Sequence, residues 1–575
     1  MNTLTTGDII IFFLTIIVTV GVGLIFKSQK KLKNDSINEY LLAGNEIGPF
    51  LTGVSICASM VSSIGLSVIP AEIVEGGVYV MIVSILSLGV SYILIQVYLL
   101  PNLIKHRLPS VYSLVKMQFG EKIYKFVLFA GLPSAVMLNA LIMFTPALAI
   151  YSIFYNIPIQ VLIIFTNLLV LFYTFIGGYS MVIVTDFVQC SIVILGMCYL
   201  AFLSVQTGFA EIYDFANDTG RLNYFGRNES LLKNFSLYVK EGTLSLLFPT
   251  LFIFLNRSYG QENIQRLLAV KGGIKSARKA HLIGFISFLI FSFACIILAL
   301  SALTFTKNCD YKNIDEDSLK KDEIIPFFST KLLQLASNNQ KYPIVGFYLA
   351  IVYAGALSTT SSFLNSMSML AITDIIPGVL PSYKIKNPSL VAKMALLASS
   401  ILITIVSLIF SVASSNLFSV FMYINSLTLP VMMIPIVAIL PFFGSFRFSR
   451  KSVVSASLIS MIVALTLVCA RNYDPPSKDF SGDYQMVDNC SFNRTAESIE
   501  LIYQLPTDFS SGNDSGVYSN PNIFQMLYWA SVPALSTITI VIFLLTANIL
   551  KLVLKDDAKE YKEGNQSSQF DWIFK

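Results

Sequence analysis

The sequence has little charge and few of the residues on which enzyme chemistry depends. Lysine, arginine, aspartate and glutamate make up only 13% of its 575 residues, about half the share of a typical soluble domain. It has two histidines, and its seven cysteines form no CxxC pair. HExxH, GxSxG and P-loop motifs are absent as well, so we expect no enzyme activity and no catalytic residue. The net charge of +5 is spread over short loops, which argues against a nucleic-acid partner.

Long apolar stretches make up most of the remaining sequence. Hydrophobic residues account for 55% of the chain, and the mean hydropathy is +0.69. A helix that crosses a bilayer needs about 20 apolar residues, and about thirteen such stretches can be counted. We therefore expect an all-α polytopic protein in contact with the lipid bilayer, with spans near residues 8–26, 47–71, 78–101, 123–155, 157–176, 181–206, 242–260, 281–305, 343–372, 391–412, 417–443, 452–470 and 524–550.

Basic residues in the short loops set the expected orientation. Cytoplasmic loops of membrane proteins are enriched in lysine and arginine. With the N-terminus outside and the C-terminus inside, the basic loops fall in the cytoplasm; their residues are Lys27, Lys30, Lys31, Lys33, Lys105, Arg107, Arg266, Lys271, Lys275, Arg278, Lys279, Arg447, Arg450 and Lys451. We expect this orientation in the plasma membrane.

Glycosylation sequons support the same orientation. Two polar loops that fall outside contain acceptor sites at Asn217, Asn228, Asn234, Asn489, Asn493 and Asn513. Sequons at Asn34 and Asn565 fall inside and should stay unmodified. Cys309 and Cys490 lie in predicted external loops, an oxidising compartment, so they are candidates for a disulfide.

Two of the expected spans are rich in small and hydroxyl residues. Residues 53–77, GVSICASMVSSIGLSVIPAEIVEGG, are apolar enough to span a membrane, but their serines, glycines and proline favour an interrupted helix. Residues 354–365, AGALSTTSSFLN, include five consecutive hydroxyl residues, Ser358–Ser362. A broken helix frees backbone carbonyls, and carbonyl and hydroxyl oxygens are ligands that a hard cation such as sodium prefers. The alternative is that the small residues serve close helix packing.

A series of sequence blocks, taken in chain order, resembles the signature blocks of the sodium/solute symporter family. The blocks are LLAGNEIGPFLTGVSICAS, PAEIVEGG, VYSLVKMQFG, YTFIGGYSMVIVTDFVQ, QENIQRLLAV, GALSTTSSFLNS and TDIIP. The nearest branch carries iodide, monocarboxylates and multivitamins. The resemblance implies a leucine-transporter-type fold with two inverted repeats. The two implied repeats are residues 47–206 and residues 242–443, and the second includes an external loop, 306–342. An extra helix and a cytoplasmic loop, 1–46, precede the first repeat, and a glycosylated external loop, 207–241, joins the two repeats. Two C-terminal helices, 444–550, with a glycosylated external loop, 471–523, and a cytoplasmic tail, 551–575, follow the second repeat.

The resemblance also implies a sodium site midway across the membrane. It would lie between the interrupted helix and the hydroxyl-rich helix. Its ligands would be the carbonyls of Ala58, Val61 and Gly355 and the hydroxyls of Ser358 and Thr359.

Further polar residues match the family pattern close to this site. Asp186, in TDFVQ, matches a carboxylate near the sodium path, although a salt bridge or a helix cap would also explain it. Arg266, after Gln265, either anchors at the lipid headgroups or takes part in gating. Residues that could support the site or a second ion are Ser361, Ser362, Asn365 and Asp186; the alternative for the first three is bonding back to their own helix.

The residues near the interrupted helix also bear on the substrate. Pro70-Ala71-Glu72 resembles a block of the anion-carrying branch, which favours a monocarboxylate or a vitamin-like anion. Iodide carriers have glutamine at two positions that are Gly65 and Ser87 here, which leaves room for a substrate bulkier than a halide. The candidate substrate-contacting residues are Ser62, Gly65, Leu66 and Ser87.

These features predict a sodium-coupled symporter that imports a small organic anion by alternating access. One alternative is a sodium-conducting channel or a substrate sensor on the same fold. Another is a symporter for iodide or another small solute. Gln118 and Gly260 depart from the residues usual in the family, so the chain resembles a divergent member.

Overall fold

The computed structural model describes most of the chain between residues 6 and 473. The described residues are 6–29, 37–106, 108–153, 157–206, 208–222, 243–305, 324–336, 344–380, 382, 385–413, 417–439, 450–473, 542–547 and 549. They form helices and no β-strand; a single isolated bridge pairs Ile47 with Val270. The prediction of an all-α protein is confirmed for this part of the chain.

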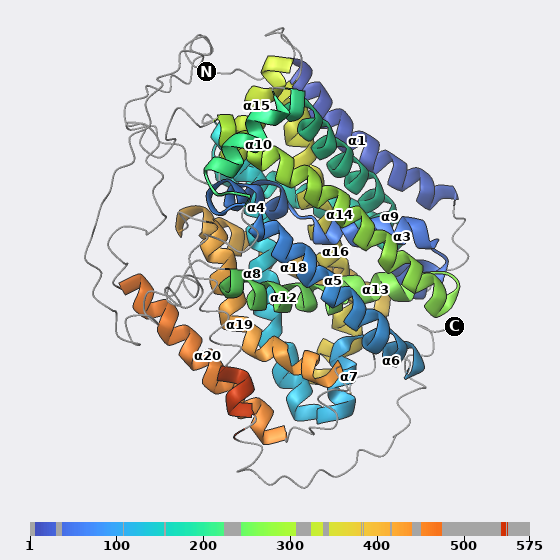
Figure 1. Cartoon of the computed structure of the whole chain (residues 1–575). Coiled ribbons are helices and arrows are strands. Elements are labelled where there is room, and N and C mark those ends of the chain that lie inside the picture. The colour runs from blue at the N-terminus through green and yellow to red at the C-terminus, as the bar shows by residue number, and fades with distance from the viewer. Residues whose placement is uncertain are drawn as a thin grey trace, which may run out of the picture.

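The helices pack into one bundle (Figure 1). Their bounds are α1 Thr6–Gln29, α2 Ile37–Leu42, α3 Pro49–Met60, α4 Ser63–Gly76, α5 Tyr79–Leu94, α6 Leu100–Lys105, α7 Val111–Phe119, α8 Glu121–Ile153, α9 Ile159–Gln206, α10 Phe209–Asp218, α12 Thr243–Tyr259, α13 Gln261–Ala269, α14 Gly273–Phe305, α15 Ile324–Ala336, α16 Ile344–Leu370, α17 Ile376–Val379, α18 Pro388–Ala413, α19 Leu417–Ile439 and α20 Arg450–Tyr473. A short 3₁₀ turn, Ala43–Asn45, follows α2, and π-helical segments, Ile95–Leu99 and Ala371–Ile375, follow α5 and α16.

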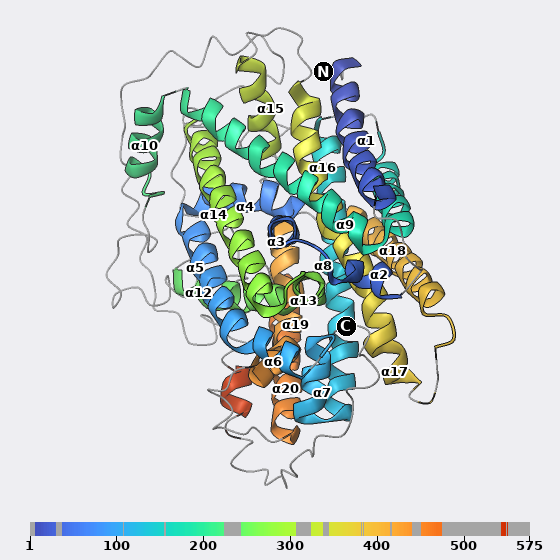
Figure 2. The ribbon, with the colours of Figure 1, turned by 90° about the vertical axis from the view of Figure 1, so that its right-hand side faces the viewer.

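The central helix of the bundle is α16. In its most apolar stretch 94% of the residues are buried, against 28% for α1, which lies along one side of the bundle (Figure 2). Helices α1, α8, α9 and α18 all pack against α16. Its hydroxyl-rich segment therefore faces protein on every side and not lipid.

Seven described helices are long and apolar enough to cross a membrane. They are Gly7–Ile25, Tyr79–Lys105, Glu121–Tyr151, Ile159–Gln206, Gly273–Phe305, Gly346–Val379 and Pro388–Val412. The bent pair α3 and α4 adds an eighth if it counts as one span. The chain is thus a multi-pass membrane protein. The total of thirteen spans and the orientation of the termini stay predictions, and most of the expected last span, 524–550, lies outside the described residues.

Helix α9 contains two of the predicted spans in a single element of 48 residues. At 1.5 Å per residue it is ~72 Å long, more than twice the thickness of a hydrocarbon core. Gly178 interrupts it with φ 62° and ψ −168°, a conformation that glycine adopts without strain. The kink separates two arms, each long enough to span a bilayer.

The predicted interruption between residues 53 and 77 is confirmed. Helix α3 ends at Met60, α4 begins at Ser63, and their axes differ by 56°. Val61 (φ −93°, ψ 87°) and Ser62 (φ −90°, ψ 173°) form the break. Here the backbone leaves the helical hydrogen-bond ladder, so polar groups become available in the interior of the bundle.

Candidate functional site

The helix break contacts α16 at a glycine. A side chain at Gly355 would place its Cβ 2.7 Å from Leu66 Cδ1 and 3.4 Å from the backbone nitrogen of Ser63. Glycine thus allows α16 to approach the start of α4 closely. This approach places the hydroxyl residues of α16 beside the broken ends of α3 and α4.

We expect Gly355→Ala to destabilise the protein by about 1–3 kcal/mol, because an added methyl in a packed interior forces its neighbours to shift. Gly21→Ala in α1 is the matched control, since nothing lies within 4 Å of the added methyl and alanine favours a helix over glycine by up to about 1 kcal/mol. Melting temperatures of the purified variants measure both effects. Equal melting temperatures would show that the close approach at Gly355 is not needed.

Four of the five predicted sodium ligands lie together. Ser358 Oγ donates a hydrogen bond to the carbonyl of Ala58 at 3.2 Å and lies 3.1 Å from that of Gly355. Thr359 Oγ1 lies 3.5 Å from the Ala58 carbonyl and 3.1 Å from the Gly355 carbonyl. The contacts to Gly355 stay within α16, but those to Ala58 join α16 to α3. Val61, the fifth predicted ligand, lies in the break with a non-helical backbone, and its role stays a prediction.

This oxygen cluster fits an alkali cation. Its members are two carbonyls and two hydroxyls, all buried and all without charge. A hard cation binds oxygen ligands of this kind, and neutral ligands suit a monovalent ion that must also leave. Among the described residues no group of three or more histidine, cysteine, aspartate or glutamate side chains could hold a metal. The donor set therefore favours sodium over a transition metal.

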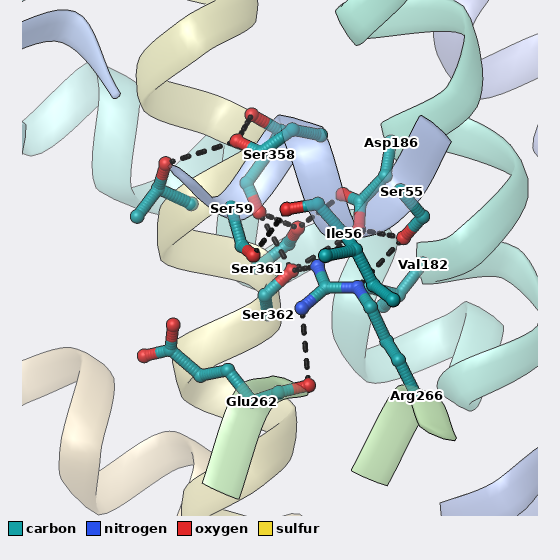
Figure 3. A network of polar contacts seen from close by, with 12 residues as sticks. Ser55, Ile56, Ser59, Val182, Asp186, Glu262, Arg266, Ser358, Ser361 and Ser362 are labelled. Atoms are coloured by element: carbon teal, nitrogen blue, oxygen red, sulfur yellow. Dashed lines mark hydrogen bonds and ion pairs between the residues drawn. The ribbon is translucent and has the colours of Figure 1, made fainter. Parts of the chain in front are cut away.

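A second polar network lies on the neighbouring turn of α16 (Figure 3). Its centre is Asp186 of α9, which forms an ion pair with Arg266 of α13. The distance from Arg266 Nη2 to Asp186 Oδ2 is 2.7 Å, and both side chains are 0% exposed. Ser55 of α3 donates to the same carboxylate oxygen at 2.9 Å and accepts from Arg266 Nε at 2.7 Å. The network thus joins three helices before α16 is counted.

The two serines of α16 complete the network. Ser362 Oγ lies 3.1 Å from Asp186 Oδ2 and also contacts Arg266 Nη2. Ser361 Oγ lies 3.4 Å from Asp186 Oδ1. Both hydroxyls also lie within hydrogen-bond distance of the Ser358 carbonyl on their own helix. The alternative that these serines bond back to their own helix is therefore confirmed, and their support of a sodium site or of a second ion stays a prediction.

Three residues differ from their predicted roles or were not predicted. Arg266 is fully buried, so the alternative that it anchors at lipid headgroups is wrong. Asn365 is buried with its amide unpaired among the described residues, and the structure does not bring it into the network. Ser55 was not singled out, although it lies one helical turn before Ala58 on the same face of α3.

Helix α13 is held against the N-terminal half of the broken helix. Ser59 Oγ lies 3.0 Å from Asn263 Oδ1 of α13. Arg257 of α12 donates through Nη1 to the Ser59 carbonyl at 3.2 Å, and its own carbonyl accepts from Asn263 Nδ2 at 2.7 Å. Together with the Ser55 contact, these bonds hold α12 and α13 against α3. A movement of α3 would have to break them.

The candidate substrate residues lie at the start of α4 and on α5. Ser62 and Leu66 are buried, while the nearest atom to a Cβ added at Gly65 is Phe291 Cζ at 4.0 Å. A methyl group at Gly65 would thus make only an ordinary van der Waals contact with Phe291 of α14. Ser87 is buried on α5, and its hydroxyl has no hydrogen-bond partner among the described residues. Their contact with a substrate stays a prediction.

Of the predicted surface modifications, only one falls on described residues. Asn217 is exposed near the end of α10. Asn228, Asn234, Asn489, Asn493 and Asn513 lie outside the described residues, as do Cys309 and Cys490.

A bundle built around a broken helix and a buried, oxygen-lined site is the architecture of this multi-pass membrane protein. The model of the sodium:solute symporter family matches residues 40–443, and the chain belongs to this family. Membership places it in a family of transporters and implies sodium as the coupling ion.

Individual relatives and one solved structure are more distant. The chain is 23% identical to human sodium-coupled monocarboxylate transporter 1 over 389 residues, covering 65% of the chain and 60% of that protein. It is 22% identical to the sodium-coupled monocarboxylate transporter 2 of Danio rerio, over 69% of the chain and 62% of that protein. It is also 22% identical to the human sodium/iodide cotransporter, over 69% of the chain and 60% of that protein. The match therefore spans only about three fifths of these relatives. A substrate-bound, outward-open Na⁺-coupled sialic acid symporter has the same fold, with a TM-score of 0.71 at 17% identity and coverage of 96% and 99%.

Proposed function

We propose that the protein is a sodium-coupled symporter that imports a small organic anion, most specifically a monocarboxylate or a vitamin-like acid, across the plasma membrane. The observation that carries the proposal is the contact of the Ser358 and Thr359 hydroxyls with the Ala58 carbonyl. It joins the two helices that a bound sodium would have to bridge. In this proposal the N-terminus lies outside, the C-terminus lies inside and the membrane is crossed about thirteen times.

Sodium would act as a clamp between α3 and α16. With sodium bound, two carbonyls and two hydroxyls converge on one charge and hold α3 against α16. Without it, the same groups retain only weak neutral hydrogen bonds. Helix α3 could then move inward together with the adjoining residue of the break, Val61. A ligand that binds one conformation more tightly shifts the equilibrium toward it, which is how sodium outside would favour the state that accepts substrate.

The start of α4 suits an anionic substrate. Its N-cap residue, Ser62, makes no side-chain capping bond, and helix N-termini attract carboxylates through their free N–H groups and partial positive charge. Half-helix N-termini near the midplane recognise anionic groups in other transporters. Gly65 would leave room beside it for an organic side group. The names of the monocarboxylate relatives agree with this substrate class.

Uptake measurements in voltage-clamped cells test this proposal. We expect labelled short-chain carboxylates, biotin or pantothenate to accumulate only with external sodium, and to exceed iodide and glucose. Iodide uptake equal to that of every organic anion would contradict the substrate assignment. A sodium current without accumulation of any solute would instead establish a channel or a sensor.

A further inference from the structure

An arginine lies in the last turn of α12, within a segment that the sequence predicts to span the membrane. Helix α12 ends at Tyr259, Gly260 has a non-helical backbone (φ −54°, ψ 147°), and α13 begins at Gln261. Arg257 therefore lies directly before a second helix break. A charged side chain inside a membrane span is costly and is a candidate for function by default.

The guanidinium of Arg257 uses little of its bonding capacity on the protein. Nη1 donates to the carbonyl of Ser59, at 3.2 Å, in the last turn of α3, where carbonyls lack a helical partner. Among the described residues this is the only hydrogen bond that the Arg257 side chain makes, and the residue is only partly buried. A guanidinium has five N–H donors in a planar fork that matches a carboxylate. Arg257 thus keeps donors for an anionic group.

The charges in this part of the bundle are balanced before any ligand binds. Asp186 and Glu262 are negative, and Arg257 and Arg266 are positive, so the sum is zero. Arg266 forms an ion pair with Asp186. Glu262 interacts electrostatically with both arginines, but Arg257 forms no ion pair with a carboxylate of the described residues. Of the two guanidinium groups, that of Arg257 is therefore the one available to a substrate anion.

Arg257 also lies close to the candidate sodium site. Its acceptor, the Ser59 carbonyl, belongs to the residue after Ala58, whose carbonyl contacts the hydroxyls of Ser358 and Thr359. An anion on the guanidinium would lie near a sodium ion held by that cluster. Opposite charges at short range inside a protein attract strongly, so each ligand would favour binding of the other.

We propose that Arg257 binds the anionic group of the substrate and selects organic acids over neutral solutes. This inference rests on the proposed function and names the residue that recognises the substrate's charge. The guanidinium holds the carboxylate beside the breaks in both helices, while its bond to the Ser59 carbonyl orients it. A purely structural arginine would hold α12 against α3 without distinguishing an acid from its amide.

The test compares an organic acid with its primary amide in proteoliposomes that contain the full-length protein. Labelled butyrate, biotin and pantothenate are the probes, and the one that wild-type protein takes up fastest is used for the variants. In Arg257→Gln we expect the KM for the acid to rise at least about tenfold, equivalent to ~1.4 kcal/mol. Inhibition by the amide and the sodium concentration for half-maximal uptake should stay near their wild-type values. Arg257→Lys keeps the charge without the fork and should give an intermediate KM.

Arg278→Gln is the matched control. Arg278 Nη2 likewise donates to a backbone carbonyl of another helical segment, that of Gln96, at 3.3 Å. Its loss removes a guanidinium of the same kind away from the helix breaks and should leave the KM for the acid unchanged.

Glu262→Gln provides a second variant that keeps Arg257, in case Arg257→Gln does not fold. Removing the negative neighbour makes the guanidinium more available to an anion. The KM for the acid should therefore fall severalfold, and inhibition by the amide should not change. In purified protein with sodium present, the acid should raise the melting temperature of Glu262→Gln more than that of the wild type, because tighter binding stabilises the folded state further.

Equal affinities of wild-type protein for the acid and its amide would overturn the proposal. The same holds if Arg257→Gln weakens both ligands equally, or if Glu262→Gln leaves the affinity for the acid unchanged. If wild-type protein accumulates none of the three acids in the presence of sodium, the proposed function itself is refuted.

Discussion

Thr359→Ala is expected to raise the sodium concentration for half-maximal uptake at least tenfold. Thr359 Oγ1 lies within hydrogen-bond distance of the carbonyls of both Ala58 and Gly355, so its loss removes one oxygen from the cluster. A hydrogen bond or ligand contact that involves a charge contributes about 1.5–3 kcal/mol, and each ~1.4 kcal/mol corresponds to tenfold in affinity. Thr359→Ser keeps the hydroxyl and should restore most of the sodium affinity. Ser358→Ala should weaken sodium dependence in the same direction.

The next residue of α16 offers a matched control. Thr360 is buried like Thr359, but its hydroxyl has no partner among the described residues. Thr360→Ala deletes the same atoms one position away and should leave the sodium dependence within about twofold of wild type, a difference of under ~0.5 kcal/mol. Equal effects of the two substitutions would mean that any truncation at this level of α16 weakens the sodium dependence. The effect of Thr359→Ala could then not be assigned to the oxygen cluster.

Asp186→Asn is expected to destabilise the protein by about 3–5 kcal/mol, because it leaves the guanidinium of Arg266 buried without its counter-charge. Asp186→Asn/Arg266→Gln removes both charges and should recover part of this loss. Thermal unfolding of purified protein, together with surface expression, measures the effect. A double variant no more stable than Asp186→Asn would show that the pair is not coupled.

An exposed ion pair in the same protein provides the comparison. Lys125 and Glu121 lie 3.0 Å apart in the first turn of α8, with side chains 36% and 50% exposed. Pairs of this kind contribute about 0–1 kcal/mol, so Glu121→Gln should change stability by less than about 1 kcal/mol. An effect as large as that of Asp186→Asn would show that burial does not determine the strength of these pairs.

The sodium-site cluster could be predicted from the sequence because its signal is local. One span contains five consecutive hydroxyl residues, and a second span is interrupted by serines and glycines. Both features differ clearly from the apolar residues around them. The resemblance of the ordered sequence blocks to the family then implied that these two segments meet at one sodium site. The structure brings Ala58, Gly355, Ser358 and Thr359 together as this pairing implied.

The Asp186 network could be predicted only in part. The charge of Asp186 within an apolar helix already indicated a partner, but Arg266 is 80 residues further along the chain, on a short helix with its own polar surroundings. Nothing in the local pattern of either residue specifies that they meet. Ser55 is one serine among several in α3, and its role depends on the rotation of that helix, which packing decides.

The two spans predicted on either side of Gly178 correspond to the two arms of α9, but hydropathy alone did not show that a kink joins them. The total number of spans stays a prediction. Apolar length does not distinguish a kink from a loop, because both arms are equally hydrophobic.

The central claim is that a sodium gradient drives solute accumulation through the cluster between α3 and α16. The most direct measurement is uptake of a labelled monocarboxylate into proteoliposomes under a tenfold inward sodium gradient at zero membrane potential. Each coupled sodium supplies ~1.4 kcal/mol, so wild-type protein should concentrate the anion at least tenfold, and a sodium ionophore should abolish this. Thr359→Ala should accumulate far less at the same sodium concentration. Equal inside and outside concentrations in wild-type vesicles, with or without the gradient, would contradict the account.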